Sequence, residues 1–294
     1  AWTDPFNAPA HKIDDLLHAA LNGRGEYLNA SNPQELQVAL ERAFLAFTQA
    51  GSSTSSAAFN STSLEEGTLL YRGFYDLRYN TGELSATAVA RDGSLAATPL
   101  WRASQQMDAK AIDQRVMVTW DRGATRGIPF RYSALNAAQK SLLSDAETRF
   151  LRGDRTVEQP TGALRKREAV GGLLGDIVNS SPVFVGAPRG INRDQSPYPV
   201  SNLYSTFAAR EANRTPVVYV GANDGMLHGF NGTNNGTVGG QETFAFIPTE
   251  VMPRLEEYTQ RDYQHQYYVD GELTVADVYD TGLGGWRTIL VGTL

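Results

Sequence analysis

The residues of this chain that could carry chemistry are three aspartates at glycine turns and one nearby histidine. Asp176, Asp224 and Asp270 each neighbour a glycine, and His228 follows Asp224 closely in the sequence. Carboxylates from such loops can hold a cation or a cofactor, but turn aspartates also accept hydrogen bonds from backbone amides. We favour the turn interpretation for the aspartates, and the sequence identifies no partner that would make His228 catalytic.

An Arg-Gly-Asp tripeptide at Arg152, Gly153 and Asp154 suggests a second kind of chemistry. On an exposed loop tip, the permissive glycine would let the two side chains present opposite charges to an integrin-type receptor. In the alternative interpretation, Gly153 serves a turn and the charged side chains form local ion pairs, for example with Glu158. The tripeptide is the one possible receptor-binding site that the sequence offers.

Motifs for other chemistries are absent from the sequence. It contains no GxSxG elbow and no GxGxxG or GxxxxGK[ST] loop. The histidines are scattered without HxH or HxxxH spacing, and the absence of cysteine excludes disulfides and thiolate metal sites. We therefore predict no catalytic, cofactor-binding or metal-binding residue in this chain.

The element that must position these residues is the segment 215–231. Pro216 marks the start of a strand, and residues 217–220 are β-branched or aromatic, as in a buried strand. The Asp224-Gly225 pair suits a tight hairpin turn, and residues 226–230 suggest the returning strand. This pattern predicts half of a four-stranded β-propeller blade, or an isolated hairpin in another all-β domain.

Composition limits the class of protein. The 294 residues carry a net charge of −6, which argues against a nucleic-acid or anionic-membrane partner, and no apolar run is long enough to span a membrane. Residues 1–3 show no signal peptide and look like the start of an excised or processed chain. Residues 289–292 lie within a strand pattern, so the parent domain is expected to continue beyond Leu294 or to be truncated there.

Three regions are expected along the chain. Residues 1–50 form a helical segment, with amphipathic helices at 11–22 and 32–47. Residues 51–63 are rich in serine and threonine and predict a flexible linker. Residues 64–294 form the β domain, an incomplete, modified propeller of the quinoprotein-like type with helical and loop insertions. The fold class is mainly β.

Within the β domain, further strands and one helical insertion are expected. The insertion lies at 133–149, a loop at 191–204, and a short helix or loop at 249–263. Trp2, Trp101, Trp120 and Trp286 are interpreted as blade-packing residues. Strands are expected at 69–77, 83–90, 115–120, 242–248, 266–269, 273–278 and 288–291, around Trp101 and from Pro182.

Several collinear motifs resemble the PilY/PilC family of type IV pilus proteins along nearly the whole chain. They are HKIDDL with HAA and NGRG (11–25), LRGDR with Glu158 (151–158), LGDIVNSSP (174–182), VYVGANDGMLH (218–228), FIP (246–248), VDG (269–271) and WRT (286–288). The hairpin alone would not indicate this family, because quinoprotein-like propellers share it.

The resemblance implies a secreted protein of Gram-negative bacteria at the fimbrium and pilus tip. It would reach the cell surface and outer membrane by export through the periplasm. Such proteins join an adhesive N-terminal part, often von Willebrand factor A-like, to a C-terminal propeller. They promote pilus assembly, counter retraction and support adhesion, twitching motility and virulence. The implied partners are pilins, minor pilins and a host-cell or surface receptor.

The resemblance also implies a calcium ion, held in the family by a DxDxDGxxD-type loop. A hard cation needs several closely spaced oxygen ligands, and Asp270, Asp277 and Asp280 are too sparse to supply them. The loop therefore lies beyond Leu294, or this member lacks it. No cofactor is expected within the chain itself.

Two functions of different classes remain open at this stage. The first is a non-enzymatic interaction protein, a pilus-tip adhesin and assembly factor. The second is a quinone-dependent dehydrogenase, which would need a cofactor stack, a divalent cation and an acidic base, and the sequence shows neither an adjacent-cysteine stack nor a cation loop. A carbohydrate-binding propeller is a weaker third possibility.

Overall fold

Three β-sheets form the frame of the structure, which is a computed structural model. It describes residues 52–60, 67–76, 78–188 and 192–294. The second of the chain's two compact units, Ser52–Leu294, contains all of them. The helices expected at 11–22 and 32–47, together with Trp2, lie outside the described residues.

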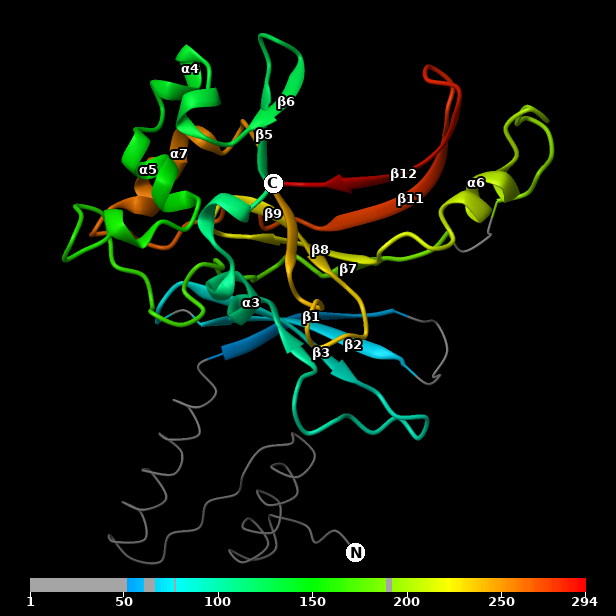
Figure 1. Cartoon of the computed structure of the whole chain (residues 1–294), viewed down its shortest axis with the longest axis horizontal. Helices are drawn as coiled ribbons and strands as arrows, with labels where there is room; N and C mark the ends of the chain where they lie inside the picture. Colours follow the sequence, from blue (N-terminus) through cyan, green and yellow to red (C-terminus); the bar gives the residue numbers. More distant parts are fainter. Residues whose placement is uncertain (1–51, 61–66, 77, 189–191) are drawn as a thin grey trace, which may run out of the picture. The chain divides into compact units, whose positions relative to one another are not determined.

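The largest sheet has six strands and contains the predicted hairpin (Figure 1). Strands β7 to β10 are neighbours in both sequence and sheet, which is the up-and-down arrangement of a propeller blade. β5 extends this blade by pairing in parallel with β10, and β6 then pairs with β5. The strands are β5 Met117–Asp121, β6 Arg126–Pro129, β7 Val183–Val185, β8 Val217–Ala222, β9 Met226–Asn231 and β10 Glu242–Ile247.

The second sheet has four antiparallel strands, and its first strand lies where a flexible linker was predicted. Residues 51–63 were expected to be flexible, but β1 Ser52–Phe59 pairs with β2 Leu69–Asp76. Serine and threonine do not prevent backbone pairing, and composition carries no information about a partner strand supplied by the next segment. β3 Thr81–Ala88 and β4 Trp101–Arg102 complete the sheet.

A two-stranded hairpin, β11 Leu273–Asp280 with β12 Gly285–Gly292, forms the third sheet. The strand predicted at 266–269 is absent, because side chains rather than a neighbouring strand satisfy its backbone donors. Gln266 N donates to the Tyr263 hydroxyl, and Tyr268 N donates to Asn223 Oδ1. Over the described residues the fold is mainly β, and the sheets are those of a partial propeller that does not close.

The helices occupy the connections between strands. The predicted insertion at 133–149 is helical but divided in two, because Asn136 and Ser144 each form a capping box that starts a new helix. The helices α3 and α6 were not predicted, because they are short and lack a side-chain N-cap. The α-helices are α3 Ala103–Ala109, α4 Ala137–Lys140, α5 Asp145–Leu151, α6 Tyr204–Arg210 and α7 Met252–Thr259. None of the described helices has the length and apolarity that crossing a bilayer requires.

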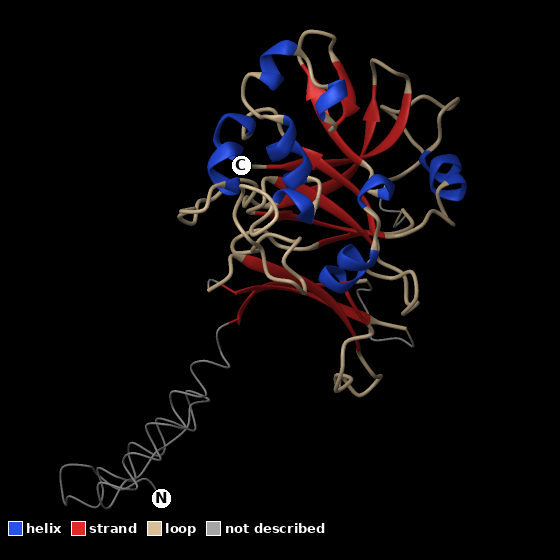
Figure 2. Ribbon diagram, turned by 60° about the vertical axis from the view of Figure 1, so that its left-hand side comes forward, coloured by secondary structure: helices blue, strands red, loops and turns tan. Residues whose placement is uncertain are grey.

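Hydrophobic packing joins the two larger sheets face to face. Residues of β2 and β3, including Tyr71 and Leu84, pack against Val218 and Phe230 of β8 and β9. The Tyr71 hydroxyl also donates a hydrogen bond of 2.7 Å to the carbonyl oxygen of Gly232, so its ring and its polar end both hold the layers together. Figure 2 shows the four-stranded sheet as a separate layer beside the remaining strands.

A second hydrophobic cluster fixes the helical insertion to the other end of the large sheet. Phe150 of α5 and Leu255 and Tyr258 of α7 are buried with Met226 and Ile247. Figure 1 shows α4, α5 and α7 grouped near β5 and β6, on the side away from α6. The insertion is therefore part of the core rather than a loosely attached lobe.

The segment around Gly175 is wedged between the two larger sheets. Gly82 N of β3 donates to the carbonyl oxygen of Leu174 at 2.9 Å, and Asn223 N after β8 donates to that of Asp176. A Cβ atom on Gly82 would lie 2.1 Å from the Gly175 carbonyl oxygen, and one on Gly175 would lie 2.3 Å from Asp224 N. Only glycine permits this close approach.

We expect Gly82→Ala to lower the free energy of unfolding by about 1–3 kcal/mol, because the added methyl group must push the sheets apart. Gly127→Ala in β6 is the matched control, since the closest atom to its added Cβ is 3.9 Å away. Denaturant unfolding of both variants measures the difference. Equal loss of stability in the two variants would contradict the wedge.

Candidate functional site

His228, which the sequence left without a partner, sits at the centre of a buried ionic network. Its Nδ1 lies 2.9 Å from Glu242 Oε1, and its Nε2 lies 3.1 Å from Asp224 Oδ2. The β8–β9 turn supplies Asp224, β9 supplies the histidine, and β10 supplies Glu242. The ring is fully buried, so water competes with neither contact.

Two carboxylates facing both ring nitrogens hold His228 in its charged form. Burial by itself lowers the pKa of His228, but the charges and hydrogen bonds of Asp224 and Glu242 outweigh it and raise the pKa to about 9. Both nitrogens must then donate, which the imidazolium alone can do. The arrangement therefore fixes an ion triplet rather than leaving a free base.

Arg115 completes the network and balances its charge. Its Nε and Nη2 each donate to the Glu242 carboxylate at 2.7 Å, and its Nη1 donates to the carbonyl oxygen of Arg152 at 2.8 Å. Burial alone raises the pKa of Glu242, but Arg115 and His228 together hold it far below its ordinary value. Two cations and two anions are thus paired with one another inside the protein.

The other two aspartates form a second network beside the first. Asn223 Nδ2 donates to Asp176 Oδ2 at 2.8 Å, and Asn179 N donates to Asp270 Oδ1 at 2.9 Å. His265 Nε2 lies 2.6 Å from Asp176 Oδ2, and this contact, against a smaller effect of burial, raises the pKa of His265. Asp270 thus accepts from a backbone amide, as predicted for a turn aspartate. That amide, however, lies far away in the sequence and not in the turn of Asp270 itself.

Asp224 also accepts from a backbone amide that is distant in the sequence, since Gly175 N donates to its Oδ2 at 3.0 Å. All three aspartates therefore link separate segments instead of closing their own turns. Among the described residues, no group of three or more histidine, aspartate or glutamate side chains could hold a metal ion. The calcium loop implied by the resemblance does not fit any side-chain cluster in this part of the chain.

The Arg-Gly-Asp tripeptide lies in the framework, and its arginine points inward. Arg152 is 4% exposed, and its guanidinium donates to the carbonyl oxygens of Phe130 at 3.0 Å and Ile112 at 2.9 Å. Burial and the nearby cations Arg131 and Arg115 lower the pKa of Arg152 to about 10, which leaves it charged at neutral pH. An arginine held in this way does not present its charge to a receptor.

The other two residues of the tripeptide have local roles. Gly153 has φ of +105°, which a side chain would strain, and Asp154 accepts from Thr156 N at 2.8 Å and from Arg149 Nε at 2.8 Å. Glu158 does not pair with Arg152 but with the buried Arg167. The geometry favours the framework interpretation of the tripeptide, with partners that differ from the expected ones.

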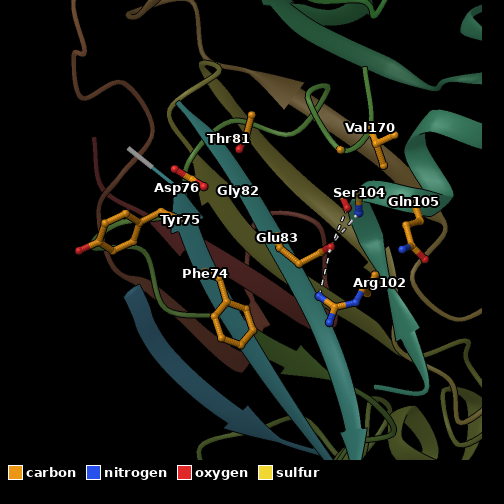
Figure 3. Close-up of a pocket in the computed structure, with 11 residues that line it drawn as sticks. Phe74, Tyr75, Asp76, Thr81, Gly82, Glu83, Arg102, Ser104, Gln105 and Val170 are labelled. Carbon is orange, nitrogen blue, oxygen red and sulfur yellow. Dashed lines mark hydrogen bonds and ion pairs between the residues drawn. The ribbon is translucent and has the colours of Figure 1, made fainter. Parts of the chain in front are cut away.

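An open pocket that the sequence did not indicate lies beside Glu83 (Figure 3). The cavity of about 300 Å³ lies between β2, β3 and the start of α3. Glu83 accepts hydrogen bonds from Ser104 N at 3.1 Å and Ser104 Oγ at 2.6 Å, which caps a helix that has no side-chain cap of its own. Burial raises the pKa of Glu83 despite these bonds. Glu83 therefore holds the start of α3 against β3 through Ser104.

The tryptophans divide into two kinds. Trp101 and Trp286 are buried, as expected for packing residues, and the Trp286 indole donates to the carbonyl oxygen of Asn202 at 3.0 Å. Trp120 on β5 is 40% exposed, so the packing interpretation is wrong for it.

Type IV pilus biogenesis factors are among the known proteins to which this chain is similar. Residues 174–294 match the family model described as the PilY1 beta-propeller domain. The chain is 40% identical to a type IV pilus biogenesis factor PilY1 homolog of Xylella fastidiosa over 97% of this chain and 23% of that protein. It is 35% identical to the type IV pilus biogenesis factor PilY1 of Pseudomonas aeruginosa strain PAK, over the whole length of this chain and 26% of that protein.

A solved structure is also similar in sequence. The crystal structure of the Pseudomonas aeruginosa PilY1 C-terminal domain is 42% identical over 36% of this chain and 19% of that chain, with a TM-score of 0.26. The chain thus spans about a quarter of the length of the curated relatives that it matches.

The charge state of His228 predicts how stability depends on pH. Its folded pKa of about 9 exceeds its ordinary value of 6.5, so its contribution is complete below pH 6.5 and is lost as the pH rises through 9. We expect the free energy of unfolding to fall by at most about 3 kcal/mol over this range. Nuclear magnetic resonance titration of the histidine ring in the folded protein measures the pKa directly.

Denaturant unfolding of the wild type and of His228→Gln should be compared at pH 6.5 and pH 9. The free energy of unfolding should fall much less between these two pH values in the variant than in the wild type. His265→Gln is the control, because its partly exposed ring contributes with the same sign but lies outside the ion triplet. An unchanged pH slope in His228→Gln would show that the ring is neutral in the folded protein.

Proposed function

The chain belongs to the PilY1 family of type IV pilus biogenesis factors, and we propose that its blades form a rigid interaction platform in pilus assembly. The observation that carries this proposal is the identity of 35–40% with PilY1 proteins over essentially the whole chain. Because the chain covers only about a quarter of those proteins, the activity of the complete protein is part of the proposal.

The buried networks support a platform rather than a catalyst. The carboxylates and histidine that could have served as acid or base are paired with one another across strand and loop boundaries. Such pairing fixes the relative positions of strands, and rigid strands let surface loops present a constant binding shape. No observation in the described part of the chain favours the alternative, a quinone-dependent dehydrogenase.

The finer functions of the proposal concern the complete protein. They are promotion of pilus assembly, opposition to retraction, attachment to surfaces or host cells, and support of twitching motility. The proposed partners are pilins and minor pilins, together with a surface or host-cell receptor. The proposed location is the pilus tip and cell surface, including the outer membrane, reached through the periplasm.

Deletion of the gene that encodes this chain should abolish surface pili, and the full-length gene supplied in trans should restore them. Electron microscopy of sheared pili and twitching assays provide the measurement. A complementing gene that carries Gly82→Ala should restore fewer pili than wild type, while Gly127→Ala should restore them fully. Normal piliation of the deletion strain would contradict the proposed function.

Host-cell attachment tests the tripeptide separately. We expect Asp154→Ala to leave attachment per pilus unchanged, because Arg152 is buried and the tripeptide caps a local turn. Attachment of the complemented strains should be counted on host cells and normalised to the number of surface pili. A loss of attachment with normal piliation would restore the receptor interpretation of Arg152, Gly153 and Asp154.

A further inference from the structure

A basic pocket lies where three loops that are distant in the sequence come together. The β2–β3 turn contributes Arg78 and Asn80, the loop before β7 contributes Arg165 and Lys166, and the chain after α7 contributes Arg261. The cavity has a volume of about 340 Å³, at the small end of the range for ligand sites. Its one acidic lining residue is Glu168.

Arg165 is the most unusual member of this basic pocket. Its guanidinium carbon lies 4.2 Å from the ring centre of Tyr258 and 5.0 Å from that of Tyr263, and its Nε donates to the carbonyl oxygen of Tyr258 at 2.6 Å. The residue is 8% exposed, and its Nη2 is buried with no hydrogen-bond partner. A buried cation with an unused donor is costly unless an anion compensates it.

The protein itself supplies no such anion in the described part of the chain. No ion pair joins Arg165, Lys166 or Arg261 to a carboxylate there. Arg78 differs, because Asp76 already binds it at 2.6 Å, and Glu158 is occupied by Arg167. Three of the four cations that line the cavity therefore have no carboxylate partner among the described residues, and Glu168 is the one acidic residue of the lining.

The remaining lining residues indicate what kind of anion fits. In its satisfied orientation, the Gln159 amide oxygen accepts from Arg261 Nε and Nη1 at 3.1 Å, so this amide holds the guanidinium at the pocket. Asn80 adds a second amide, and Tyr79 and Tyr263 add ring surface. Amides bind hydroxyl groups, aromatic rings pack on the C–H face of a sugar, and arginine binds carboxylate or sulfate.

We propose that this basic pocket binds an acidic sugar, with the carboxylate or sulfate group directed at Arg165, Lys166 and Arg261. The net charge of −6 repels extended polyanions such as nucleic acids or anionic membranes, so a compact ligand is favoured. This inference stands independently of the role in pilus assembly.

Isothermal titration of the full-length protein tests the proposal with three probes: a uronic-acid oligosaccharide, a sulfated oligosaccharide and a neutral oligosaccharide of the same length. We expect at least one acidic probe to bind and the neutral probe not to bind. The double variant Lys166→Gln, Arg261→Gln should weaken this binding at least about tenfold, the loss expected for charge-assisted hydrogen bonds. Both residues are exposed, so the fold should survive the change.

The matched control is the double variant Arg126→Gln, Arg193→Gln, which removes the same charge from exposed positions outside the pocket. It should bind the acidic probe as the wild type does. Absence of binding by the wild type, equal binding of the neutral probe, or equal weakening in both double variants would overturn the proposal. So would pocket-dependent binding of a hexaglutamate peptide in place of the sugars.

Discussion

The charge pairing of Asp224, His228, Glu242 and Arg115 is the interaction on which the rest of the structure depends. Four charged groups are buried together, and each costs several kcal/mol to remove from water unless all its partners remain in place. The turn after β8, strands β9 and β10, and the segment before β5 must therefore assemble in one register. A slip of one residue in β9 would separate the imidazolium from both carboxylates.

This constraint extends to the second sheet through the wedged segment. Asp224 binds Gly175 N, and the neighbouring Leu174 carbonyl binds Gly82 N of β3. Both contacts need glycine at the point of closest approach. A continuous set of hydrogen bonds thus joins the ionic network to the four-stranded sheet. This explains how two sheets that share no strand can hold a fixed arrangement.

Local sequence signals predicted the elements but not their partners. The Asp224-Gly225 turn, the β-branched run before it and the helical pattern at 133–149 are each encoded within a few residues, and the structure contains them. In contrast, the strand at Ser52–Phe59, the loop at 266–269 and the inward direction of Arg152 depend on contacts with distant segments. The basic pocket, formed from three separated loops, left no local signal at all.

Two arginines around one aromatic ring show how structural and ligand-binding charges can be told apart. The guanidinium of Arg167 lies 3.9 Å from the ring centre of Phe150 and that of Arg165 lies 5.6 Å from it. Arg167 is satisfied by Glu158 through two hydrogen bonds, so its charge belongs to the framework. Arg165 also lies over Phe150, but no carboxylate among the described residues pairs with it, and it lines an open cavity. Pairing both arginines with carboxylates would serve stability best. The anion of a ligand would therefore pair with Arg165, the arginine that has no carboxylate partner.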